Sequence, residues 1–121
     1  MKHRHTGLTR IIKAFGYSLD GLRAAYASEA AFRQELWLCA IAVPIAFWLD
    51  VTAVERALLI GSLFLILIAE LINTAIETVI ERISPDIHAL SKKAKDIGSA
   101  VVLMALLGAG CIWAVIVAAQ F

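Results

Sequence analysis

Residues 57–82 read ALLIGSLFLILIAELINTAIETVIER, a long apolar run that carries carboxylates only in its second half. The run keeps the period of a helix, and most polar groups of its second half fall within about 60° of Glu70. These residues, called the polar stripe below, are Glu70, Asn73, Thr74, Glu77 and Glu81. The opposite face is aliphatic apart from Thr78. The pattern therefore predicts a helix that presents carboxylates at the edge of an apolar environment.

The composition indicates an integral membrane protein. The chain has 121 residues, of which 61% are hydrophobic, and its mean hydropathy is +0.84. Soluble domains average roughly 45–50% apolar residues, and one of this size has too little interior to bury more. The length allows a single domain, and the net charge of +1 gives no indication of nucleic-acid binding. Cys39 and Cys111 lie in apolar runs, where we expect small hydrophobic side chains rather than a disulfide.

The N-terminal region is expected to form an amphipathic helix over about residues 8–27. Its apolar residues share one face: Leu8, Ile11, Ile12, Phe15, Leu19, Leu22 and Tyr26. Basic residues such as Arg10 and Lys13 lie opposite, as in a helix that rests in the lipid headgroup plane. The alternative is an amphipathic helix packed on its own soluble domain, which the hydrophobic composition disfavours. Gly16 and Gly21 weaken the expectation that this helix is continuous.

Three membrane spans are expected, over about residues 30–49, 56–82 and 96–119. The first has only fourteen uncharged residues, Leu36 to Leu49, so it reaches across about 30 Å of hydrocarbon only if its helix starts near Ala30. Pro44 is tolerated within such a helix. The second span is expected to end at Ser84-Pro85, and residues 86–96 to form a polar loop. The fold class is therefore all-α, with three transmembrane helices and an N-terminal amphipathic surface helix.

Basic residues are distributed unevenly along the chain. Ten of the eleven Lys and Arg residues fall in the N-terminal region or in 82–95, and only Arg56 lies between the first two spans. The positive-inside rule then predicts a cytoplasmic N-terminus, a cytoplasmic 82–95 loop and a C-terminus on the opposite side. The polar stripe thus meets the cytoplasmic boundary.

Carboxylates inside a membrane are a functional signal, because a charge at the bilayer centre costs roughly 2.5–3.5 kcal/mol on insertion scales. Glu70 lies about 10 Å nearer the bilayer centre than Glu77 along the helix. Alone, Glu70 could merely hold helices together, protonated or paired with a base. Because Asn73 and Glu77 lie on the same helix face as Glu70, a functional site is favoured.

Further charged residues approach the same boundary: Glu29, Glu35, Lys95 and Asp96. Carboxylates together with phosphate oxygens commonly hold Mg²⁺ in phosphoryl-transfer sites. The sequence contains neither a Walker A motif nor G-x-G-x-x-G, so a nucleotide would bind outside the common nucleotide folds.

Four segments together resemble the prokaryotic diacylglycerol kinases, which are small integral-membrane enzymes. They are GLTRIIKAFGYSLDGLRAAYASEAAFRQE, the WLDV after the first span, the ELINTAIE of the polar stripe, and LSKKAKDIGSAVVL. The combination of E-x-x-N-[ST]-A-I-E with A-K-D-x-G-S-A is specific, and the resemblance covers essentially the whole chain in the same order. Glu81 stands where relatives usually have Asp, and we interpret it as a bystander to the site.

The resemblance implies phosphorylation of diacylglycerol to phosphatidic acid by ATP and Mg²⁺ in the bacterial inner membrane, with a periplasmic C-terminus. It also implies a homotrimer whose active sites are shared between neighbouring subunits. Glu70 matches the general base for the lipid hydroxyl, and Glu29 and Glu77 match the carboxylates that hold Mg²⁺. The implied nucleotide contacts are Arg10, Tyr17, Glu29, Glu77, Asp86, His88, Lys95 and Asp96. The implied positions near the lipid are Arg10, Arg23, Glu35, Trp48, Glu70 and Ser99.

Two other functions remain open at this point. Undecaprenol kinase is similar in fold and in its E-x-x-N-x-A-I-E core, although EAAFRQE and the N-terminal helix favour diacylglycerol by resemblance. A non-catalytic transporter or assembly factor could instead use the polar stripe as a proton or ion site. Such a protein would tolerate loss of Lys95 and Asp96, because it has no phosphates to position.

Overall fold

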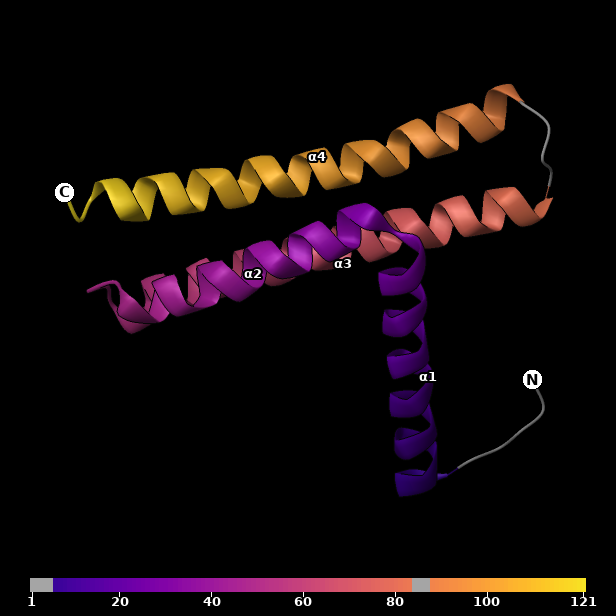
Figure 1. Cartoon of the computed structure of the whole chain (residues 1–121), viewed down its shortest axis with the longest axis horizontal. Coiled ribbons are helices and arrows are strands. Elements are labelled where there is room, and N and C mark those ends of the chain that lie inside the picture. Colours follow the sequence, from indigo (N-terminus) through magenta and orange to yellow (C-terminus); the bar gives the residue numbers. More distant parts are fainter. Residues whose placement is uncertain (1–5, 84–87) are drawn as a thin grey trace.

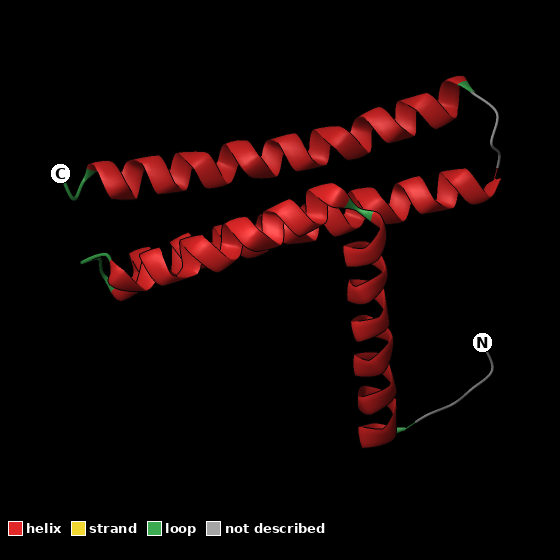
Figure 2. Cartoon of the chain, in the orientation of Figure 1, coloured by secondary structure: helices red, strands yellow, loops and turns green. Residues whose placement is uncertain are grey.

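The computed structural model describes residues 6–83 and 88–121. Its four α-helices are α1 (Gly7–Ser28), α2 (Ala30–Trp48), α3 (Ala53–Ile83) and α4 (Ala89–Ala118). Helices α2, α3 and α4 lie alongside one another, whereas α1 runs crosswise to them (Figure 1). Helices joined by short loops account for the described ranges, which contain no strand (Figure 2). The all-α fold class is confirmed.

Three of the helices, α2, α3 and α4, are long and apolar enough to cross a membrane. With 19 residues, α2 is about as long as the hydrocarbon layer is thick, and α3 and α4 exceed that thickness by roughly ten residues each. Large apolar side chains point outward from all three, among them Trp37, Phe64 and Met104, each more than 60% exposed. An outward apolar surface of this kind is typical of contact with lipid.

The start of α4 differs from the sequence expectation. Residues 86–96 were expected to form a loop, but α4 begins at Ala89, so the loop is wrong from that residue onward. Ala, Leu and Lys are strong helix formers, and the side chain of His88 caps the helix by accepting a hydrogen bond from the Leu90 N–H at 3.0 Å. The polar residues at the start of α4 therefore belong to the helix, as an extension beyond its apolar part. The expected helix end at Ser84-Pro85 lies outside the described residues.

Helix α1 is continuous through Gly16 and Gly21, and its apolar face is exposed in the chain. A single residue, Glu29, joins α1 to α2 with extended backbone angles. Arg33 closes this corner: its guanidinium donates to the carbonyls of Tyr26 (2.6 Å) and Ala27 (3.3 Å). Carbonyls at a helix end otherwise have no partner, so this contact stabilises the abrupt change of direction.

A second arginine closes the corner between α2 and α3. Arg56 donates to the carbonyls of Ala46 (3.0 Å) and Leu49 (2.9 Å) at the end of α2. Thr52 and Glu55 form a reciprocal capping box, with bonds of 2.9 and 3.1 Å, at the start of α3. Arg56, the one basic residue at the corner between α2 and α3, therefore stabilises the fold.

Small residues let the three long helices approach closely. One buried cluster joins Cys39 and Ala42 of α2 to Leu63 and Ile66 of α3 and Ala109 of α4. The indole N–H of Trp113 donates to the buried Ser62 hydroxyl at 3.0 Å, which links α4 to α3 by a polar contact inside the span. Cys39 and Cys111 are free thiols, so no disulfide contributes.

Replacing Arg56 by Gln should destabilise the protein by about 1–3 kcal/mol, because the carbonyls of Ala46 and Leu49 lose a charged donor. Unfolding of the purified protein in mixed detergent micelles with increasing SDS would measure this loss. Lys13→Gln, which removes one exposed positive charge from α1, should change stability by less than about 0.5 kcal/mol. Equal stability of the two variants would contradict the capping role of Arg56.

Candidate active site

The polar stripe turns its deepest carboxylate into the protein. Glu70 is 4% exposed, and it and Ser62 are the only buried polar side chains in the described part of the chain. Asn73, Thr74 and Glu77 are half-buried, whereas Glu81 is exposed. The stripe thus passes from buried to exposed along α3, and Glu81 stands apart from it as expected.

Three other carboxylates lie near Glu70. The carboxyl group of Glu35, on α2, lies within hydrogen-bonding reach of that of Glu70, and Glu29 and Glu77 are close enough for their charges to act on it. One carboxyl oxygen of Glu35 is buried without a partner in the described chain. We call these four residues, Glu29, Glu35, Glu70 and Glu77, the acidic cluster. The sequence analysis grouped Glu35 with the lipid and missed its contact with Glu70.

The acidic cluster lies where α1 meets the long helices. Its members come from the corner residue Glu29, the first turns of α2, and α3, and both α3 and α4 continue past this corner (Figure 1). An open groove of about 670 Å³ lies beside it, between α1 and α3. The groove is mainly apolar, with hydroxyl groups from Ser18, Ser28, Thr74 and Thr78. An amphipathic molecule could therefore approach the cluster along this groove.

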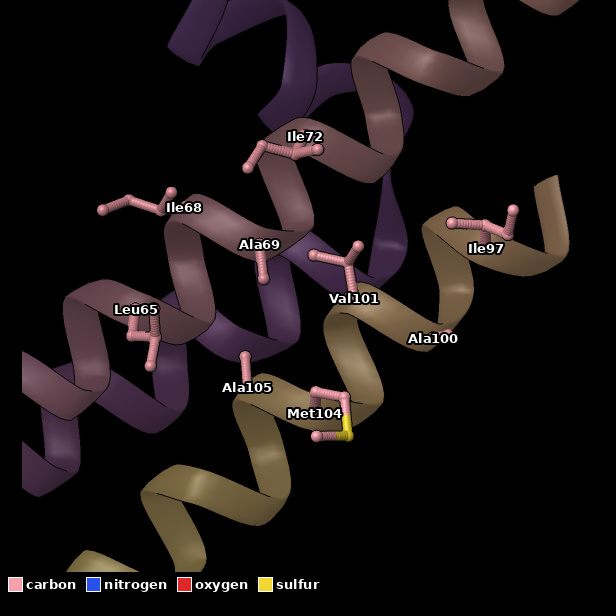
Figure 3. Close-up of a pocket in the computed structure, with 9 residues that line it drawn as sticks. All are labelled: Leu65, Ile68, Ala69, Ile72, Ile97, Ala100, Val101, Met104 and Ala105. Atoms are coloured by element: carbon pink, nitrogen blue, oxygen red, sulfur yellow. The ribbon is translucent and has the colours of Figure 1, made fainter. Parts of the chain in front are cut away.

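A second groove, of about 470 Å³, lies between α3 and α4 (Figure 3). Its lining is aliphatic except for the thioether of Met104, and it includes no member of the acidic cluster. It offers apolar contact and no catalytic group.

Several residues implied by the resemblance lie away from the acidic cluster of their own chain. Asp96 is exposed, and it lies about 160° around α4 from Gly98, which is buried against α3. Asp96 therefore points away from α3, and its carboxylate accepts a hydrogen bond from the Lys92 ammonium at 2.7 Å. Lys95 and Ser99 are also exposed. Within one chain, Asp96 therefore does not face the acidic cluster, and its predicted contact with the nucleotide stays a prediction.

The implied site residues on α1 also lie away from the acidic cluster of their own chain. Arg10 and Tyr17 are exposed, and along α1 they lie about 28 and 18 Å from Glu29. Arg23 forms an exposed ion pair with Asp20 at 3.3 Å. Trp48 is 79% exposed at the far end of α2, about 20 Å along the helix from Glu35. His88 caps α4, and Asp86 lies outside the described residues.

The chain is similar to known proteins over its whole length. A model of the family described as prokaryotic diacylglycerol kinase matches residues 16–117. The chain is 52% identical to the diacylglycerol kinase of Escherichia coli K12, over 100% of this chain and 99% of that protein. It is 51% identical to the diacylglycerol kinase of Pseudomonas aeruginosa PAO1, over 92% and 90% of the two chains, and 45% identical to that of Haemophilus influenzae, over 92% and 94%.

The chain belongs to the prokaryotic diacylglycerol kinase family. It is therefore an enzyme of lipid metabolism with membrane helices, and diacylglycerol is its substrate. The transporter alternative is set aside. Within this diacylglycerol kinase, the acidic cluster is the only site-like gathering of carboxylates among the described residues that includes a buried member.

The donor set of the acidic cluster fits Mg²⁺ with substrate phosphates better than a metal held by protein alone. No group of three or more His, Cys, Asp or Glu side chains in residues 6–83 and 88–121 is arranged to hold a metal ion. Mg²⁺ prefers hard oxygen ligands and commonly takes one or two carboxylates plus substrate phosphates. Glu29 and Glu77, the less buried carboxylates beside Glu70, are of the ligand type that such a site uses.

Proposed function

We propose that this enzyme transfers the γ-phosphoryl group of ATP to the free hydroxyl of diacylglycerol at the cytoplasmic face of the bacterial inner membrane. The products are phosphatidic acid and ADP. The buried Glu70 carboxyl, surrounded by Glu29, Glu35 and Glu77, is the observation that carries the proposal. A base at this depth suits a hydroxyl that cannot leave the bilayer.

Glu70 acts as the general base in this proposal. Its carboxylate takes the proton of the lipid hydroxyl, the hydroxyl oxygen forms a bond to the γ-phosphorus, and the bond to the β,γ-bridging oxygen breaks to release ADP. Glu35 holds the Glu70 carboxyl in place from α2. Glu29 and Glu77 hold Mg²⁺, which when bound neutralises phosphate charge. About 10 Å separates Glu77 from Glu70 along α3, which suits a water-soluble nucleotide and a lipid approaching from opposite sides.

The distribution of charge and the shape of the chain support this orientation in the membrane. The basic residues cluster at the N-terminus and in 82–95, which supports a cytoplasmic location for both and a periplasmic C-terminus. Helix α1 runs crosswise to the spans with Leu8, Ile11 and Phe15 exposed, as expected of a helix resting in the headgroup plane (Figure 1). The α1–α2 corner then marks the membrane boundary, and Glu29 lies on it.

The active site is shared between copies of the chain in this proposal. Asp96 points away from the acidic cluster, and Arg10 and Tyr17 lie far along α1 from it. These residues contribute to a nucleotide site only if a neighbouring subunit supplies the cluster. A closed homotrimer places the same two surfaces together at each of its interfaces.

Glu70→Gln should lower phosphorylation by at least about a hundredfold, the usual scale for a lost general base. The assay uses purified protein in lipid-loaded micelles with Mg²⁺-ATP and either diacylglycerol or undecaprenol as acceptor. Labelled phosphatidic acid is expected from the wild type. Turnover by Glu70→Gln at the wild-type rate would exclude its role as base, and undecaprenol as the better acceptor would favour the related lipid kinase.

Glu29→Gln and Glu77→Gln should raise the Mg²⁺ concentration needed for half-maximal activity, because each removes a ligand charge. Added Mg²⁺ should partly restore their turnover, whereas it should not restore that of Glu70→Gln. Mg²⁺ titrations of the three variants in the same assay make the comparison. An unchanged Mg²⁺ requirement in both ligand variants would refute the assignment.

Mixing Glu70→Gln with Asp96→Asn chains should restore activity if α3 and α4 serve one site from different subunits. Random one-to-one assembly of a cyclic homo-oligomer leaves about a quarter of such sites intact. The control is a mixture of Glu70→Gln with Glu77→Gln, which should gain nothing because both changes lie on α3. No gain in the first mixture, with confirmed co-assembly, would show that each chain builds its own site.

A further inference from the structure

Gly98 of α4 lies against the carboxamide of Asn73. Gly98 is buried, and a Cβ at this position would overlap the Asn73 side-chain oxygen and lie 3.6 Å from the terminal methyl of Ile76. At the other six glycines, a Cβ would have no atom of the described residues within 4 Å, apart from the glycine's chain neighbours and its own helix backbone. Gly98 is therefore the one glycine of the described structure at which an added Cβ would meet another side chain, so that side chain would have to move.

Close helix packing alone does not explain this glycine. Ala105 and Ala109 lie on the same buried face of α4, and α3 accommodates a methyl group at both positions. Of these three positions on the buried face of α4, only Gly98, at the level of the polar stripe, lacks a side chain. The requirement is thus local to Asn73 and not general to the contact between α3 and α4.

The absence of a side chain at Gly98 leaves room for one end of the Asn73 carboxamide. Its oxygen is buried and has no hydrogen-bond partner in residues 6–83 and 88–121 apart from the weak donor that a Cα–H group offers. Oxygen and nitrogen branch from the same carbon, so an oxygen held at α4 leaves the NH₂ group to donate away from α4. Asn73 lies one helical turn from both Glu70 and Glu77, on the same face of α3.

We propose that Gly98 is a positioning residue, which seats the Asn73 carboxamide so that its NH₂ group faces the carboxylates of Glu70 and Glu77. A neutral donor between two carboxylates holds both in a fixed orientation without replacing the charge of either. This inference rests on the proposed role of Glu70 as the base. It adds that the orientation of Glu70 depends on a backbone contact from α4.

Gly98→Ala tests the proposal. The added methyl displaces the carboxamide, so kcat should fall at least about tenfold, as expected when a catalytic group is misplaced by about 1 Å. The KM for diacylglycerol should stay within about twofold, because the orientation of the base matters only in the reaction step. Gly108→Ala, also on α4 but in open space, should leave kcat within about twofold.

The role of Asn73 is isolated by repeating the change in an Asn73→Ala background. There the carboxamide is absent, so Gly98→Ala should cause no further loss of kcat and no further loss of resistance to SDS. If Gly98→Ala alone fails to fold, the kcat of Asn73→Ala is compared with that of the double variant. Equal kcat values support the positioning role, and a lower kcat in the double variant contradicts it. Equal losses in both backgrounds, or a folded Gly98→Ala with wild-type kcat, would overturn the proposal.

Failure of this inference is distinct from failure of the proposed function. A wild type without product refutes the kinase reaction, and an active Glu70→Gln refutes the base. Neither result depends on Gly98. A normal Gly98→Ala beside an inactive Glu70→Gln refutes only the positioning role.

Discussion

Backbone hydrogen bonding inside a bilayer constrains every other feature of this fold. No water reaches the hydrocarbon layer, so each span must be a helix and each helix end needs a partner for its carbonyls. Arg33 and Arg56 meet this need at the two described corners, each donating to the last carbonyls of the preceding helix. The Arg33 corner turns α1 across the spans, and this turn brings Glu29 next to the stripe on α3.

In the proposed mechanism, the members of the acidic cluster have different tasks according to their depth in the membrane. Glu70 is buried among apolar helices, where a carboxyl group is costly and therefore has a reason to be present. Glu29 and Glu77 are nearer water, where a charged nucleotide can arrive. A kinase whose substrates approach from a lipid phase and from water needs this gradient. A helix that crosses the membrane provides this gradient from apolar to aqueous surroundings along one row of side chains.

Two features of the site could not be read from the sequence, because sequence spacing gives the position of a residue along a helix but not the rotation of that helix against its neighbours. Asp96 follows Lys95 at the expected depth, yet α4 is turned so that Gly98 faces α3 and Asp96 faces outward. Glu35 approaches the expected boundary, but its contact with Glu70 depends on how α2 rotates against α3. The start of α4 was misplaced because polarity was taken as a sign of a loop, whereas Ala89 onward has high helix propensity.

The sequence alone determined the class of the protein, the number of spans and the stripe on α3, because hydropathy and a 3.6-residue period are local properties. Its motifs also indicated the enzyme family, which the comparisons then confirmed. The tertiary structure alone decided that Glu70 is buried, that Glu35 reaches it, and that Gly98 abuts Asn73. These contacts join residues far apart in the chain, and they depend on the angles and rotations at which whole helices pack, which no local pattern encodes.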